Sequence, residues 1–256
     1  MQLRNLIVMA QPGDEILCCS HLLLREPEQT RVLCIADGAI VNERALQRSE
    51  ADTPDEFADL RHNQWFCAVT ELPFPIDRVA ALGLAEQEVL TKGAEVIDTI
   101  LDVIRAERPS TVYTHAYEGG HPDADAVCYA VHQAIGCLQE AGEVSPSLLE
   151  FTGYHARDGL FRSAEFLSPY PSAQRARLTE EETTRKTAAL RCFHSRYDLV
   201  ARFRLADEAW RKPDRYDFEK PPHEGALYYE LARSGVTWKE FQAFVAATER
   251  DLPCAR

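Results

Sequence analysis

The sequence has no long hydrophobic run and little positive charge. Among its 256 residues, no apolar stretch approaches the ~20 residues of a membrane-spanning helix. The first ten residues lack a basic segment followed by a long apolar core, so we expect no secretory signal. Acidic residues outnumber basic ones, 41 against 28, for a net charge of -13. This charge argues against nucleic acid or a membrane surface as the main partner, and we expect a small-molecule substrate.

The cysteine spacing also lacks the patterns of metal or disulfide frameworks. None of the eight cysteines forms a C-x-x-C pair. Two are adjacent and others lie in strand-like or helix-like patterns: Cys18, Cys19, Cys34, Cys128 and Cys192. We therefore expect most of them to be small buried side chains in a reducing cytoplasm. The spacing favours neither a disulfide framework nor a thiolate zinc site.

Internal repeats, linkers and low-complexity segments are absent as well. Hydrophobic residues make up 45% of the chain and charged residues 27%, as in an ordinary globular protein. We predict a single domain over residues 1–256, with a less regular part from about residue 155.

The chain is organised around residues 6–15. Four apolar residues, Leu6–Met9, predict a strand that is buried on both faces. A Pro-Gly pair then breaks the chain, and the apolar run that follows predicts a helix that begins at Asp14. Asp14 and Glu15 would lie in the first turn, where the helix dipole favours carboxylates. Polar groups thus gather at the carboxyl end of a first strand, where open α/β folds place their sites.

Strand-like and helix-like segments alternate over the first 155 residues. Strands are predicted at 6–9, 31–36, 111–115 and 148–154, and helices at 57–69, 89–105 and 124–138. A loop is predicted at 49–54, a short strand or loop at 73–79, and a loop with aromatic residues and prolines at 210–222. Further helices are predicted at 180–193 and 236–249. The alternation predicts an α/β three-layer sandwich with a mainly parallel sheet.

A second polar cluster follows the predicted strand at 111–115. It reads Tyr-Glu-Gly-Gly-His-Pro-Asp-Ala-Asp over residues 117–125 and is too polar and turn-rich for a core segment. Because the carboxyl ends of parallel strands meet at one edge of a sheet, we expect both polar loops to lie at the same site.

The two loops resemble the signatures of the PIG-L/LmbE-type zinc-dependent N-deacetylases, which remove acyl groups from amino sugars and related amines. The loops of that family read A-H-P-D-D-E and H-P-D-H, whereas this chain has AQPGDE at 10–15 and HPDAD at 121–125. Weaker similarities follow in order: Arg61-x-x-Gln64-x-x-x-Ala68, a Leu82-Gly83-Leu84 turn and Lys186-x-x-Ala189-Leu190. The resemblance covers most of the chain and implies a Rossmann-like fold.

The resemblance also implies where the family's zinc chemistry would lie. Its three metal ligands correspond to Gln11, Asp14 and Ala124, and its general base corresponds to Gly13. A neutral amide and a methyl group do not replace imidazoles as zinc ligands, and glycine takes no proton. We therefore predict no resident zinc and no ordinary zinc-water hydrolysis. Zinc would require a rebuilt site, with Asp14 and His121 joined by Asp123 or Asp125 and with His115 nearby.

Ten residues are candidates for the site. We predict catalytic roles for Asp14, His121, Asp123 and His223 and substrate-binding roles for Gln11, Gly13, Arg61, Tyr117, Glu118 and Asp125. A His–Asp pair two residues apart can orient an imidazole for acid–base work near pH 7. Structural alternatives stay open: Asp14 and Asp125 as first-turn carboxylates, His121 with Asp123 as a loop clamp, and Arg61 as an anchor for a loop.

Three functions from different classes remain. The first is a family member with a metal-independent pocket that acts on, or binds, an amine, amide or amino-sugar-like metabolite. The second is a non-catalytic binding protein that keeps the pocket. The third is a conventional metal-dependent N-deacetylase with substitute ligands. Loss of both the base and the metal ligands favours the first.

Overall fold

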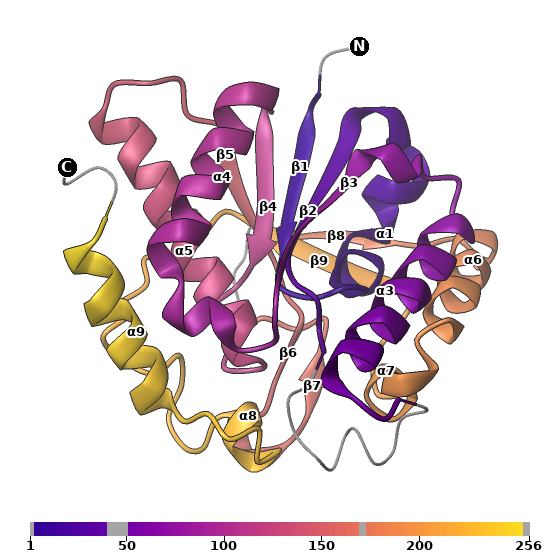
Figure 1. The fold of residues 1–256 in the computed structure, drawn as a ribbon. Coiled ribbons are helices and arrows are strands. Elements are labelled where there is room, and N and C mark those ends of the chain that lie inside the picture. The colour runs from indigo at the N-terminus through magenta and orange to yellow at the C-terminus, as the bar shows by residue number, and fades with distance from the viewer. Residues whose placement is uncertain (1–2, 40–50, 169–172, 253–256) are drawn as a thin grey trace.

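A seven-stranded sheet forms the centre of the computed structural model, which describes residues 3–39, 51–168 and 173–252 (Figure 1). Its order is β3-β2-β1-β4-β5-β9-β8. The first five strands are parallel, and β9 runs antiparallel to both of its neighbours, β5 and β8. The strands are β1 (Asn5–Met9), β2 (Thr30–Ala36), β3 (Val79–Leu84), β4 (Thr111–His115), β5 (Ser147–Phe151), β8 (Gln174–Arg177) and β9 (Asp207–Arg211). A small separate sheet pairs β6 (Tyr154–His155) with β7 (Arg162–Ser163).

Helices cover both faces of this sheet. They are α1 (Asp14–Arg25), α3 (Pro54–Thr70), α4 (Gly93–Glu107), α5 (Pro122–Glu140), α6 (Glu180–Arg191), α7 (Tyr197–Val200), α8 (Tyr228–Leu231) and α9 (Trp238–Arg250), with the 3-10 turns η1 (Pro27–Gln29), η2 (Ile76–Arg78), η3 (Glu88–Thr91), η4 (Arg157–Gly159) and η5 (His194–Arg196). In Figure 1, α4, α5 and α9 lie on one side of the sheet and α1, α3 and α6 on the other. This arrangement confirms the predicted three-layer sandwich with a mainly parallel sheet.

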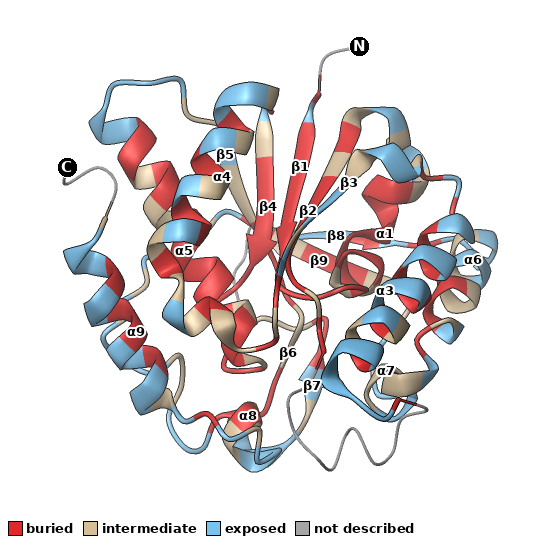
Figure 2. Ribbon diagram, viewed as in Figure 1, coloured by how far each residue is buried: buried red, intermediate tan, exposed pale blue. Residues whose placement is uncertain are grey.

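Strand β1 shows why the central strands are apolar at every position. Leu6 and Val8 pack into the core under α4 and α5, whereas Ile7 and Met9 pack into the core under α1 and α6. All four side chains are fully buried, as the red central strands of Figure 2 illustrate. Because successive side chains in a strand point to opposite faces, a strand between two helical layers must be apolar on both.

The strands away from the centre depart from the prediction. Residues 82–84, predicted as a turn, form the end of β3, whose side chains are largely exposed at the edge of the sheet. Trp210, predicted in a loop, lies in β9, and β8 was not predicted at all. Edge and antiparallel strands need no continuous apolar run, so the pattern that identified β1 and β2 is missing there. Of the predicted loop at 49–54, residues 51–53 belong to no helix or strand and Pro54 begins α3, whereas residues 49–50 lie outside the described residues.

The cysteines follow the prediction only in part. Cys18, Cys19, Cys34 and Cys128 are buried thiols, as expected. However, a disulfide joins Cys67 to Cys192, linking α3 to the end of α6. The two cysteines are separated by 125 positions in the sequence, so local cysteine spacing could not predict that they pair. None of the helices in the described parts of the chain is long and apolar enough to cross a membrane.

Candidate ligand pocket at the carboxyl edge of the sheet

The first polar loop, residues 10–15, turns directly from β1 into α1. Gly13 has a φ of 101°, in the left-handed region that glycine adopts most easily. The backbone N–H of Gln11 donates to Asp14 Oδ2 at 2.9 Å, and that of Gly13 donates to Glu15 Oε2 at 3.0 Å. Glu15 Oε1 also accepts from the indole of Trp65 at 2.8 Å. Glu15 is therefore a structural residue that holds the loop against α3.

Asp14 faces the end of β4. Its Oδ2 lies 3.4 Å from Nε2 of His115, which also accepts a hydrogen bond from the backbone N–H of Ala10. Burial opposes ionisation of Asp14, but His115, the Gln11 N–H and His121 together lower its pKa below the ordinary value. Asp14 is thus an ionised carboxylate that faces the site.

The second polar loop leads from β4 into α5. His121 is the N-cap residue of α5, and its Nδ1 accepts from the backbone N–H of Asp123 at 3.2 Å. Its Nε2 lies 3.1 Å from Nε2 of Gln11, so the two loops meet here as expected. Asp123 is fully buried, and its Oδ2 accepts from the backbone N–H of Gln87 at 2.9 Å. Burial raises the pKa of Asp123 to about 6.

Two further carboxyl groups brace this loop. Asp125 Oδ1 accepts from the backbone N–H groups of Glu118 and Gly119 at 3.2 and 3.1 Å. Glu118 Oε2 accepts from the backbone N–H of Gly153 at 2.9 Å, whereas its Oε1 has no partner among the described residues. Burial raises the pKa of Glu118 to about 8 and that of Asp125 to about 7. Glu118 therefore retains its proton near neutral pH.

Glu86 and Arg196 are site residues that the sequence did not identify. Glu86 Oε1 lies 3.2 Å from His121 Nε2, and Glu86 Oε2 accepts from Arg196 at 2.8 Å. Arg196 also donates to Gln11 Oε1 at 3.3 Å. Burial opposes ionisation of Glu86, but Arg196 and His121 lower its pKa to about 2. Glu86 could have been found from the sequence, because it follows the end of a strand, β3, by two residues. No sequence feature of η5 indicated that Arg196 would reach the site.

Residues of both loops enclose a narrow cavity of about 50 Å³. The remaining lining comes from the end of β4, from α1, from β6 and from the segment after η5, and the lining side chains include Gln11, Asp14, His115, Glu118, His121, Asp125, Leu17, Tyr154, Leu199 and Phe203. Ala124, at the third family ligand position, contributes only its methyl group. The volume is small beside the ~300–1,000 Å³ of typical ligand pockets, so the cavity admits only a small chemical group.

Five of the ten candidate residues do not line this cavity: Gly13, Arg61, Tyr117, Asp123 and His223. The hydroxyl of Tyr117 donates to the carbonyl of Lys220, and its ring packs among Tyr216, Phe218 and Phe241. His223 lies beside His155, with its Nδ1 2.8 Å from the carbonyl of its neighbour Glu224. Neither Tyr117 nor His223 lines the cavity, because aromatic packing holds Tyr117 and a local hydrogen bond holds His223.

Arg61 also lies outside this cavity. It is 2% exposed, donates to the carbonyl of Pro12 at 3.2 Å and lines a second cavity of about 40 Å³ next to the first. The guanidinium carbon lies 5.2 Å from the ring centre of Phe193. These contacts match the structural alternative, in which Arg61 anchors the first loop.

Comparison with known proteins agrees with this geometry. The family model described as GlcNAc-PI de-N-acetylase (PIG-L) matches residues 6–135, just over half of the chain. The chain belongs to the PIG-L family. The matched part spans β1 to α5 and thus includes both polar loops. No curated protein sequence matches the chain.

Solved structures show the same fold in PIG-L-like deacetylases and beyond. An A40926 pseudoaglycone deacetylase is 16% identical, with a TM-score of 0.60 over 84% of this chain and 100% of that one. An N,N'-diacetylchitobiose deacetylase from Pyrococcus horikoshii is 14% identical, with a TM-score of 0.58 over 81% and 82%. A 4-carboxy-2-hydroxymuconate hydratase from Pseudomonas putida KT2440 is 17% identical, with a TM-score of 0.55 over 78% and 82%. These similarities establish the fold, which hosts more than one reaction.

The donor atoms at the PIG-L ligand positions do not fit a zinc ion. Gln11 offers a neutral amide whose oxygen already accepts from Arg196, and Ala124 offers no donor atom. In the described part of the chain, three or more His, Cys, Asp or Glu ligand atoms lie within 4.8 Å of one another only at Cys128, His132 and Glu150, none of which lines the cavity. The rebuilt site considered from the sequence is therefore not pre-assembled, and zinc normally needs three protein ligands.

Proposed function

We propose that this PIG-L protein binds the acyl group of a small acylated amine, such as an N-acetylated amino sugar, and cleaves its amide bond without zinc. One observation carries the proposal: two carboxyl groups, Asp14 and Glu118, line the same narrow cavity, and their surroundings lower the pKa of Asp14 and raise that of Glu118. Two carboxyl groups whose pKa values are driven apart are suited to act as base and acid.

The size of the cavity supports an acyl group as the part that is bound. About 50 Å³ accommodates an acetyl-sized group, whereas a sugar ring must lie at the mouth. The apolar residues Leu17, Leu199 and Phe203 suit the methyl end of such a group, and the polar lining suits its carbonyl. The names of the PIG-L model and of the diacetylchitobiose deacetylase support an acetylated amine as the substrate class.

The chemistry follows from the protonation states. Asp14 accepts a proton from a water molecule, whose oxygen attacks the acyl carbon. Glu118 donates its proton to the departing nitrogen as the C–N bond breaks, so the products are a carboxylic acid and a free amine. His121, held by Asp123 and Glu86, positions the amide of Gln11 beside the carbonyl. Asp125 keeps Glu118 in place through the backbone of the loop.

The test uses protein treated with a chelator and then desalted. N-acetylglucosamine and simple N-acetylamines are added, saturable binding is measured by calorimetry, and released amine is measured with an amine-reactive dye. We expect turnover that added zinc does not increase. Asp14→Asn and Glu118→Gln should each reduce kcat at least ~100-fold, the usual contribution of a positioned acid or base.

A matched pair of histidine variants controls for general damage. His121→Gln should weaken binding, whereas His62→Gln, on the exposed surface of α3, should leave binding and turnover unchanged. Turnover that appears only when zinc is restored, in the wild type and also in Cys128→Ser, whose side chain lies outside the cavity, would reject the metal-independent reaction in favour of a conventional deacetylase. Saturable binding without amine release would reject hydrolysis and favour a binding protein.

A further inference from the structure

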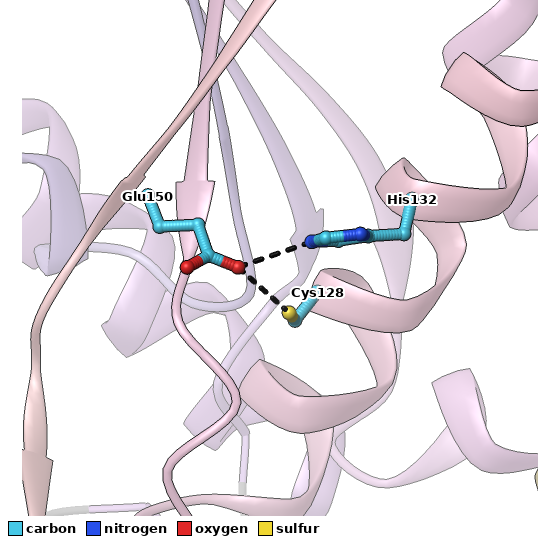
Figure 3. Close-up of side chains that lie close together, drawn as sticks. All are labelled: Cys128, His132 and Glu150. Carbon is cyan, nitrogen blue, oxygen red and sulfur yellow. Dashed lines mark hydrogen bonds and ion pairs between the residues drawn. The ribbon is translucent and has the colours of Figure 1, made fainter. Parts of the chain in front are cut away.

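Three metal-binding side chains converge one turn beyond the pocket along α5. Cys128 and His132 are four residues apart on the same face of α5, and Glu150 projects toward them from β5 (Figure 3). Glu150 Oε1 lies 3.0 Å from His132 Nε2 and 3.9 Å from Cys128 Sγ. All three ligand atoms lie within 4.8 Å of one another. The group has no counterpart in the PIG-L motif positions described above.

These separations suit a tetrahedral metal ion. With metal–ligand distances of ~2.0–2.3 Å, the ligand atoms of a tetrahedral zinc site lie about 3.4–3.6 Å apart. The observed separations of 3.0 and 3.9 Å from Glu150 Oε1 lie on either side of that range, and no two of the three ligand atoms are more than 4.8 Å apart. Side-chain shifts of about 1 Å or less therefore bring the three atoms to tetrahedral spacing. Cys128 and its neighbours on α5 belong to the packed core, and Glu150 on β5 is fully buried.

The surroundings of Glu150 orient its carboxylate toward the other two ligands. The hydroxyl of Tyr216 donates to Glu150 Oε2 at 2.7 Å, and Arg211 lies 3.6 Å from the same oxygen. Oε1 is thus the oxygen that faces Cys128 and His132. Such outer hydrogen bonds are typical of carboxylates that bind metals. The positive charge of Arg211 offsets the negative charge of Glu150. A thiolate at Cys128 would therefore supply the net negative charge that attracts a cation.

We propose that Cys128, His132 and Glu150 form a site for a divalent cation of the zinc type, separate from the ligand pocket. One thiolate, one imidazole and one carboxylate suit Zn²⁺, and a water molecule completes four ligands. The cation bridges α5 to β5 and thereby stabilises the wall that bears Asp125 and Glu118. The side chain of His132 is 18% exposed, whereas Cys128 and Glu150 are fully buried.

The test loads chelator-treated protein with Co²⁺ or Zn²⁺ alone, without substrate. We expect one metal ion per chain by elemental analysis and, for Co²⁺, a thiolate-to-metal absorption band. Cys128→Ser should abolish the band, and His132→Gln should weaken zinc binding at least ~10-fold. The matched control is Cys34→Ser, another buried thiol, which donates to the carbonyl of Ala36 as a hydroxyl also does. It should keep full metal content and the band.

Each result decides the proposal independently of the pocket chemistry. Absence of the band and of stoichiometric zinc in the folded wild-type protein would overturn it, with folding checked by circular dichroism. So would metal that persists in Cys128→Ser but is lost in Asp14→Asn, because the ion would then lie in the pocket. Zinc that raises the melting temperature of the wild type and of Cys34→Ser, but not of Cys128→Ser or His132→Gln, would support a bridge between α5 and β5.

Discussion

The ring of Phe193 lies 3.0 Å from the position that a Cβ atom on Gly13 would occupy. Gly13 stands where the PIG-L general base is expected, so the space that a base would use is closed by an aromatic ring from the segment after α6. The absence of a side chain at position 13 and the close approach of the Phe193 ring therefore depend on each other. Restoring an aspartate at this position therefore requires more than one substitution.

Gly13→Asp should lower the free energy of unfolding by about 2–5 kcal/mol, since it adds both backbone strain and a clash. Gly142→Asp is the matched control, because Gly142 also has a positive φ, 68°, but nothing lies within 4 Å of its missing Cβ. It should cost only about 1 kcal/mol. Denaturant unfolding measures both. Equal losses in the two variants would show that Phe193 does not restrict this position.

Combining Gly13→Asp with Phe193→Ala tests the contact itself. Phe193→Ala alone should cost about 3–5 kcal/mol, because it leaves a cavity in the core. If the ring and the new side chain compete for one space, the free energy of unfolding lost in the double variant should be about 1–3 kcal/mol smaller than the sum of the two single losses. Strict additivity would contradict a shared space.

Lys186 is fully buried, and its Nζ lies 2.6 Å from Glu208 Oε1. Glu208 also accepts from the backbone N–H groups of Ser20 and His21, so the pair joins α6, β9 and α1. Lys186→Met should cost about 3–5 kcal/mol, because it leaves a buried carboxylate without its cation. Arg185→Met, on the exposed side of the same helix, should change stability by no more than about 0.5 kcal/mol. A small loss for both would contradict a structural role for the pair.

Arg196 holds Glu86 ionised inside the site. The pKa of Glu86 is about 2 in the folded protein, below its ordinary value of 4.5. The ionised carboxylate therefore stabilises the fold when the pH is above 4.5, and this stabilisation is lost as the pH falls toward 2. Arg196→Met should therefore cost about 2–4 kcal/mol at pH 7. The difference from the wild type should narrow as the pH falls below about 4.5. Arg191→Met, at the exposed end of α6, serves as the control. A difference that stays constant with pH would exclude Glu86 as the origin.

Glu118 should make the protein less stable as the pH rises. Its folded pKa of about 8 lies above the ordinary value of 4.5, so the folded state retains a proton that the unfolded state loses between these pH values. Glu118→Gln should therefore raise the melting temperature more at pH 8 than at pH 5. Melting curves across this range measure the effect. An identical shift at both pH values would show that Glu118 is ionised in the folded protein and unsuited as an acid.

The sequence by itself determined the parallel centre of the fold and the edge at which the site lies. Continuous apolar runs such as Leu6–Met9 belong to strands covered on both faces, and the polar loops that follow β1 and β4 meet because parallel strands end at one edge. Edge strand β3 and the antiparallel strands β8 and β9 were not predicted, because partly exposed strands lack a continuous apolar run.

Only the tertiary structure decided what the site contains. Glu86 and Arg196 join His121 and Gln11 from segments 35 and 185 residues away along the chain, and Phe193 closes the space beside Gly13. Tyr117 and His223 turn away from the cavity, although both lie in polar, site-like sequence. Contacts between distant segments depend on how whole layers pack, and local spacing does not record that packing.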